Sequence, residues 1–383
     1  MNHSIQAAPY WRLSGFYFFY FASLGALLPY WNPYLKSQGF DSFQIGLLMA
    51  IVLGTKIVAP NIWGWIADRC GRRMMIVRLA SLLSVFCFSG VFLSSGYGWL
   101  IVVMVSFSFF WNASLPQFEA TTMNHLKANT SVYNSVRMWG SVGFVILSVG
   151  LGYLIDWQGT GIVPVILWLL FAMIWLSSLI VPECATGQSP GEYQPLRSVL
   201  ARKEVRALLL GCFLIQVSHG PYYTFYSIYL EESGYQTGLI GQLWALGVIA
   251  EIVMFIFMVR LLPLLGSRNL MLAAFLLTTV RWVLLALFVD HLVVLVLVQV
   301  LHAASFGIVH AVAIHLIHQY FTGHNQGKGQ ALYSSLSFGA GGAIGSLYSG
   351  LIWESLGPVW VYLIAALFAL SAFYVAWRGI HTR

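Results

Sequence analysis

Charge is too scarce in this chain for it to fold as a soluble protein. Asp, Glu, Lys and Arg make up 8% of the 383 residues, whereas hydrophobic residues make up 59%. Soluble proteins carry about 25% charged residues. Long apolar runs recur along the sequence, and a run of about 20 apolar residues spans a bilayer as a helix. We therefore predict an all-α integral membrane protein.

Twelve spans can be placed along the chain. Twelve helices of about 21 residues use about 252 residues and leave about ten for each connection, so a soluble domain has no room. The apolar runs are also too long for the alternating strands of a membrane barrel. The predicted spans are residues 13–35, 43–66, 74–95, 98–124, 132–155, 161–181, 207–230, 237–261, 268–289, 292–320, 328–352 and 357–378.

Basic residues are distributed unevenly between the two sets of loops. Of the 19 Lys and Arg residues, 15 fall in alternate loops and the tails, one (Lys36) falls in the opposite loops, and three fall in or beside spans. Cytoplasmic loops collect Lys and Arg, so this 15-to-1 distribution places both termini in the cytoplasm. The net charge of +7 thus reflects topology, and we expect no nucleic-acid partner.

A long polar stretch divides the chain near its middle. We predict an N-terminal six-helix bundle at residues 1–181, a cytoplasmic linker at 182–206 and a C-terminal six-helix bundle at 207–383. Residues recur between the two bundles at offsets of 195 and 198 positions, which indicates an internal repeat. The matched pairs are Gly46 and Gly241, Gly71 and Gly266, Gly152 and Gly350, and Asp156 and Glu354.

A charged motif lies between the second and third spans, and it reads Gly64-Trp-Ile-Ala-Asp68-Arg69-Cys-Gly71-Arg72-Arg73. Asp68 can cap or face a helix N-terminus, and Gly71 permits a tight turn. The motif and the six-plus-six repeat resemble the major facilitator superfamily, whose members have two pseudo-symmetric bundles of six helices. The resemblance implies that the motif locks one gate of an alternating-access cycle. The alternative is a plain basic loop.

Ionisable side chains inside the spans are few, and each costs at least ~2.5 kcal/mol by insertion scales. Each is therefore a functional hypothesis, with a static helix-joining pair or a structural hydrogen bond as the alternative. The sequence contains no GxSxG, HExxH or P-loop motif and no metal-ligand spacing, so we predict no enzyme, no cofactor and no metal. The ionisable residues are Lys56, Glu119, Arg137, Glu251, Arg281, His219, His302, His310 and His315.

Two groups of these residues resemble the proton symporters of the lactose permease type. Glu119 and Arg137, 18 residues apart, match the acid–base pair that binds sugar there, which implies a substrate-binding role. Glu251, Arg281 and His302 fall where that type keeps the charged residues of its eighth to tenth helices. The resemblance implies that these three couple transport to protons.

Two positions depart from that pattern. Phe144 stands where a Trp stacks on the sugar, and Ser305 stands where a Glu carries the proton. The end of the first span, with Leu28-Pro29-Tyr30-Trp31 and Tyr34-Leu35-Lys36, resembles the 3-phenylpropionate permease group more closely. This resemblance implies a multi-pass protein of the bacterial cytoplasmic (inner) membrane.

Aromatic side chains crowd the first and seventh spans. The first helix of each repeat lines the cavity in this superfamily, so the resemblance implies that some of these rings contact substrate. Most aromatic residues in such a chain face lipid or neighbouring helices. The predicted contacts, in addition to Glu119, Arg137 and Lys56, are Tyr20, Phe144, His219 and Tyr223.

Lys56 and Glu251 are separated by the repeat offset of 195 residues. They should therefore occupy equivalent positions on the second and eighth helices, across the central cavity from each other. A direct bridge and a Lys that leaves its partner to bind a substrate carboxylate both fit this placement.

The leading hypothesis is a proton-coupled symporter that imports a small organic solute, with an aromatic carboxylate such as a phenylpropionate as the best candidate. A sugar, oligosaccharide or nucleoside symporter is the first alternative. Efflux of amphipathic compounds and a transporter-like solute sensor are the others. The expected partners are the solute, protons and the lipid bilayer, and the expected state is a monomer.

Overall fold

The computed structural model describes residues 9–126, 129–184 and 195–381, and every element in these ranges is helical. Residues 185–194 of the predicted linker and residues 1–8, 127–128 and 382–383 of the predicted bundles lie outside the description. The first half contains α1 (Tyr10–Ser37), α2 (Ser42–Cys70), α3 (Arg73–Phe88), η1 (Ser89–Phe92), α4 (Tyr97–His125), α5 (Thr130–Gln158), η2 (Thr160–Ile162) and α6 (Val163–Leu179). The second contains α7 (Leu196–Leu200), α8 (Lys203–Glu232), α9 (Thr237–Leu287), α10 (Leu292–Val300), η3 (Ala303–Ile308), α11 (Val309–Tyr320), η4 (Gly323–Asn325), α12 (Gln326–Ser334), η5 (Ser335–Gly341), α13 (Gly342–Leu356) and α14 (Pro358–Gly379).

All the predicted spans fall on helical segments. By length and hydropathy alone, nine helices among the described residues can cross a membrane. One of the nine, α9, covers two predicted spans, 237–261 and 268–289, in 51 residues. The helices α8 and α12–α13 hold many polar or small residues on their inner faces, which lowers their hydropathy. The structure therefore supports an all-helical membrane fold, and the number of twelve spans stays a prediction.

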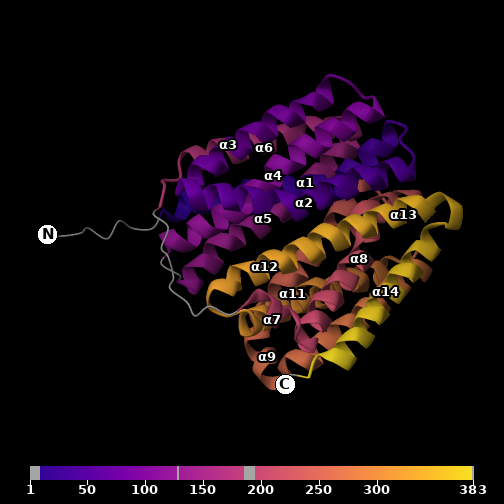
Figure 1. Ribbon diagram of the computed structural model, residues 1–383. Helices are drawn as coiled ribbons and strands as arrows, with labels where there is room; N and C mark the ends of the chain where they lie inside the picture. Colours follow the sequence, from indigo (N-terminus) through magenta and orange to yellow (C-terminus); the bar gives the residue numbers. More distant parts are fainter. Residues whose placement is uncertain (1–8, 127–128, 185–194, 382–383) are drawn as a thin grey trace.

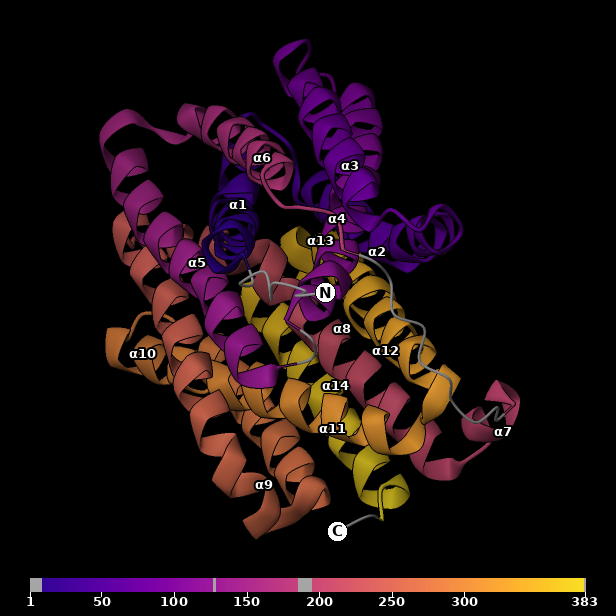
Figure 2. The ribbon, with the colours of Figure 1, turned by 90° about the vertical axis from the view of Figure 1, so that its left-hand side faces the viewer.

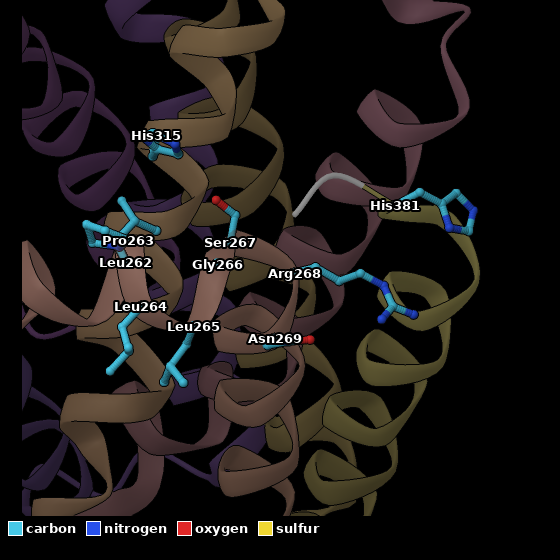
Figure 3. Close-up of a pocket in the computed structure, with 10 residues that line it drawn as sticks. All are labelled: Leu262, Pro263, Leu264, Leu265, Gly266, Ser267, Arg268, Asn269, His315 and His381. Atoms are coloured by element: carbon cyan, nitrogen blue, oxygen red, sulfur yellow. The ribbon is translucent and has the colours of Figure 1, made fainter.

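The α9 helix is broken at Gly266, whose φ of 75° no residue with a side chain adopts easily. Gly71, its partner in the repeat, has a φ of 64° and ends α2. A crevice opens beside the break, between the α9 segment 262–269, His315 and His381 (Figure 3). The guanidinium of Arg268 there donates to the carbonyls of Ile380 (2.7 Å) and Trp377, so it fastens the break to the end of α14.

The two halves lie against each other as separate bundles, with α1–α6 on one side and α8–α14 on the other (Figure 1). They meet along two seams, where α2 packs on α13 and η5, and α5 packs on α9 (Figure 2). Glycines make these seams tight. A Cβ added to Gly46 would collide with the backbone of Gly350, and one added to Gly241 would collide with the carbonyl of Ser148. Three of the four repeat pairs, all but Gly71 and Gly266, thus lie where the two halves meet.

Carboxylates join the halves at the end of the molecule where α1 is followed by α2. Asp156 at the end of α5 accepts the N–H groups of Thr237 (3.0 Å) and Gly238 (2.8 Å), which begin α9. Glu354 near the end of α13 accepts the N–H of Ser42 (3.0 Å), which begins α2. We call these two contacts the acid caps. They are equivalent in the repeat, and each uses the partial positive charge of a helix N-terminus.

The same end carries further bonds between the halves. Lys36 pairs with Glu232, and the Gln242 amide donates to the Tyr153 hydroxyl. At the opposite end, the Asn61 amide donates to the Ser335 hydroxyl at 3.5 Å, the limit of a hydrogen bond. Among the described residues, polar bonds between the halves are therefore more numerous at the end that carries the acid caps.

Candidate functional site

The N-terminal half carries an acid–base couple in the last third of α4 and the first third of α5. Glu119 on α4 and Arg137 on α5 lie 3.9 Å apart (Oε1 to Nε), with side chains 40% and 31% exposed. The guanidinium stacks 3.8 Å above the ring of Phe21 on α1 and 5.6 Å from that of Tyr17. Because the contact is long and both groups are accessible, the couple leaves hydrogen-bonding capacity for a ligand.

The C-terminal half carries a second couple of similar length. Glu251 on α9 and His302, at the junction of α10 and η3, lie 3.8 Å apart (Oε2 to Nε2), with side chains 18% and 8% exposed. The π-helical segment η3 begins directly after His302. Such segments often mark functional sites, because the extra residue in the turn changes the direction of a side chain.

The two couples face each other across the interface between the halves. The charge of Arg137 reaches Glu251 and also His310, the second residue of α11 after η3, although among the described residues no ion pair within 4 Å joins Arg137 to Glu251. The structure thus brings the predicted binding pair and the predicted coupling pair to one region. The role of each residue stays a prediction.

Behind the second couple lies a fully buried network around Arg281. Its guanidinium donates to the Val298 carbonyl (2.9 Å) and the Ser305 hydroxyl (2.8 Å). It also packs at 4.4 Å on the rings of both Tyr222 and Trp282. Within the described ranges no carboxylate oxygen lies within 4 Å of Arg281. Aromatic faces and neutral oxygens therefore hold this cation in place.

Ser305 links Arg281 to His219. His219 on α8 has Nδ1 2.8 Å from the Ile215 carbonyl and Nε2 3.2 Å from the Ser305 hydroxyl. A carbonyl oxygen only accepts, so Nδ1 carries a proton, and a neutral His219 accepts at Nε2. The serine at the position of a proton-carrying Glu therefore serves as a connector. Since His219 is 0% exposed, a solute would reach it only after the helices move.

Lys56 lies on the inner side of α2. Successive residues turn by about 100° around a helix. Thr55 is hydrogen-bonded to α4, Ile57 packs against Gly339 of η5, and Val58 is 49% exposed on the outside. Lys56 therefore points between α4 and η5, toward the interface of the halves.

The direct bridge between Lys56 and Glu251 is not present in this structure. No carboxylate oxygen of the described residues lies within 4 Å of the Lys56 amino group. The repeat offset predicts equivalent positions in the two bundles, but it does not predict the distance between them.

The predicted aromatic contacts lie at different depths. Tyr20 is 3% exposed and stacks on Trp111 inside the N-terminal half. Phe144 is 7% exposed, at the seam of α5 and α9, and its ring lies 6.5 Å from that of Trp244. Tyr223 is partly exposed beside His219. Of these rings, Tyr223 is the most accessible in this conformation.

The motif between α2 and α3 forms an ion-paired turn. Asp68 pairs with Arg73 (2.8 Å), which also donates to Gln117 of α4 (3.0 Å). Arg69 lies 3.8 Å above the ring of Trp65. Gly71 supplies the left-handed residue of the turn, as predicted. Gly64 faces α4, and Arg72 directly precedes α3.

The interpretation of Asp68 as a helix cap is wrong in this conformation. Glu183, after α6, accepts the N–H groups of Met74 (3.0 Å) and Met75 (3.3 Å) at the start of α3. Asp68 instead pairs with Arg73, which lies five residues further along the chain and begins α3. The sequence carried no local signal for Glu183, because 109 residues separate it from Met74. For the acid caps the sequence did carry a signal, because Asp156 recurs as Glu354 in the repeat.

Comparison with known proteins identifies this architecture. The profile of the MFS_1 like family matches residues 10–364. The chain belongs to the MFS_1 like family. A member named "Probable 3-phenylpropionic acid transporter" from Escherichia coli (strain K12) is 31% identical over 94% of this chain and 95% of its own length. The maltose permease of Geobacillus stearothermophilus is 26% identical over 91% of this chain and 89% of its own length.

Solved structures show the same major facilitator fold. The nucleoside transporter NupG superposes with a TM-score of 0.81 at 16% identity, covering 98% of this chain and 99% of that one. A bacterial homologue of the human lysosomal transporter Spinster, in an inward-facing and unoccupied conformation, gives 0.75 at 14% identity, with 98% of both chains covered. This MFS_1 like protein is thus a multi-pass membrane transporter.

Proposed function

We propose that this transporter carries a small aromatic carboxylate into the cell together with protons, across the cytoplasmic membrane of a bacterium. The observation that carries the proposal is an excess of positive charge on the inner face of the N-terminal half. Arg137 and Lys56 both lie there, and Glu119 is the nearest acid, 3.9 Å from Arg137. An anionic solute would neutralise the second cation, which a neutral sugar would not. The name of the E. coli relative points to the same class of solute.

Binding of the carboxylate would use the couple of the N-terminal half. A guanidinium with accessible N–H groups binds a carboxylate through two parallel hydrogen bonds. The Lys56 ammonium would supply the second positive charge, and Glu119 would orient Arg137. Both cations lie between the two halves of the protein. A charge there costs less free energy than a charge that faces lipid.

Proton movement would use the couple of the C-terminal half. A carboxylate and an imidazole 3.8 Å apart can share or exchange a proton after a small approach. Arg137 acts on Glu251, so a solute that neutralises Arg137 would change how readily Glu251 holds its proton. This electrostatic influence would couple solute binding to proton binding.

Transport by purified protein in liposomes tests the proposal. An imposed inward proton gradient should drive accumulation of 3-phenylpropionate above its external concentration, and a proton ionophore should abolish that accumulation. The matched control is 3-phenylpropionamide, which has the same shape without the charge, and it should neither accumulate nor compete.

Two results would contradict the proposal. Accumulation that follows a sodium gradient and ignores the ionophore would exclude proton coupling. Equal competition by the amide would exclude a carboxylate site, and competition by maltose or by a nucleoside would then favour the sugar or nucleoside alternative.

A further inference from the structure

Four aromatic rings gather at the interface face of the C-terminal half. Phe306 of η3, His310 of α11, Tyr333 of α12 and Phe338 of η5 lie with ring centroids 5.6 to 6.0 Å apart in five pairwise contacts. The His310 Nδ1 also lies 3.2 Å from the Tyr333 hydroxyl. We call this group the four-ring cluster. Neither the repeat nor the gating motif accounts for it.

The cluster is built on two irregular segments. Phe306 lies in the π-helical segment η3 (Ala303–Ile308), and Phe338 lies in the π-helical segment η5 (Ser335–Gly341). A π-turn weakens a helix, because it leaves backbone hydrogen bonds strained or unmade, and it persists mostly at functional sites. Here two such turns on adjacent helices place one Phe each into the same cluster.

The cluster faces the cations of the other half. Arg137 acts electrostatically on His310, and η5 packs on α2 beside Lys56, where Gly339 meets Ile57. Phe306, His310 and Phe338 are only partly buried although they lie within spanning helices, whereas Tyr333 behind them is 3% exposed. Three of the four rings therefore keep surface that no other part of the described protein covers.

We propose that the four-ring cluster binds the aromatic ring of the solute, with Phe306 and Phe338 in direct contact. This inference rests on the proposed function and adds the residues that select a ring. The carboxylate binds Arg137 in one half while the ring binds Phe306 and Phe338 in the other. A solute with both groups bridges the two halves, and one that lacks the ring binds to one half only.

Binding measurements on the purified full-length protein separate ring recognition from charge recognition. The probes are 3-phenylpropionate and 3-cyclohexylpropionate, which share the carboxylate and the chain length. Since an aromatic pair contributes beyond its buried area, wild type should prefer the phenyl compound by about fivefold. Phe306→Leu and Phe338→Leu should each remove most of that preference and leave the affinity for the cyclohexyl compound unchanged. The matched control is Phe86→Leu on α3, whose ring is 75% exposed on the outside and which should behave as wild type.

The outcomes distinguish the two proposals. If wild type binds neither carboxylate, the proposed function fails and the ring site fails with it. If wild type binds both but the two Leu variants keep the phenyl preference, the ring site alone is wrong. Phe306 and Phe338 lie on different helices. If one Leu variant does not remain monodisperse, the other variant still tests the ring site.

Discussion

The two halves present acid–base couples of almost equal length but of different chemistry. Glu119 and Arg137 are 3.9 Å apart and more than 30% exposed, whereas Glu251 and His302 are 3.8 Å apart and less than 20% exposed. An arginine stays charged at every physiological pH, so no proton passes between the two groups of the first couple. A carboxyl and an imidazole can each bind and release a proton, so a proton can pass between the two groups of the second couple. The same spacing thus serves binding in one half and proton exchange in the other.

Neutralising the acid of the first couple should have the largest effect on binding. Glu119→Gln keeps the shape but releases Arg137 from its partner, so the guanidinium loses its orientation. We expect loss of solute binding by about 100-fold or more, in line with the loss of a charged hydrogen-bonding group at a site. Titration calorimetry measures it.

The control for that variant is its fold. Because the side chains of the couple are 31% and 40% exposed, Glu119→Gln should stay monodisperse, with a melting temperature within a few degrees of wild type. A large loss of thermal stability would show that the couple is a structural pair, and normal uptake would exclude Glu119 from the site.

Neutralising the acid of the second couple should separate coupling from binding. Glu251→Gln cannot give up a proton, so uphill uptake driven by a proton gradient should be lost. Exchange of solute between equilibrated compartments should remain, with an affinity within about threefold of wild type, a change below 1 kcal/mol. Liposome uptake and counterflow measure the two activities.

A second substitution gives both couples the same chemistry, a Glu paired with an Arg. His302→Arg gives the second couple the permanent charge of the first, and it should also abolish uphill uptake while exchange continues. Loss of exchange in both variants, in folded protein, would mean that this couple binds the solute or braces the helices.

The third prediction concerns the second cation of the N-terminal half. Lys56→Gln should weaken binding of a carboxylate solute about tenfold, or about 1.4 kcal/mol, and barely change binding of the uncharged amide. The charge has no carboxylate within 4 Å among the described residues, so its removal leaves no buried acid unpaired. A stability change without any difference between acid and amide would contradict a role in binding.

The smallest expected effect tests the repeat at the acid caps. Asp156 accepts two N–H groups and Glu354 accepts one, so Asp156→Asn should open the capped end more than Glu354→Gln does. A cap is worth about 1 kcal/mol, which changes the population of the open state a few-fold. Spin labels at the exposed Gln38 and Ser355, in a cysteine-free background, report the distance across this end. Equal effects would mean that the second N–H contributes nothing.

Much of the fold could be predicted because hydropathy and repeats are properties of the chain itself. The predicted span 43–66 lies within α2, and 98–124 within α4. The motif predicted a tight turn at Gly71, and Gly71 and its repeat partner Gly266 both have positive φ. The spans depend on hydropathy in a lipid solvent, and the glycine turns depend on local backbone sterics. Both can be judged from a short stretch of sequence.

The site could be predicted only in part, because distances between helices depend on packing. The spacing of Glu119 and Arg137 and the resemblance to known symporters predicted a couple, and the structure brings the two within 4 Å. The sequence did not indicate that the charge of Arg137 would reach Glu251. The π-turns were also invisible, since one extra residue in a turn leaves the apolar pattern almost unchanged.

The acid caps have a consequence for the speed of the cycle. Each cap holds main-chain N–H groups that water can solvate as soon as the helices part, so opening leaves no group stranded. A few contacts of about 1 kcal/mol each give a closed state that thermal fluctuation reverses without help. A gate closed by one deeply buried ion pair would instead cost several kcal/mol to break. The caps themselves therefore add little to the barrier that the halves must cross to open at this end.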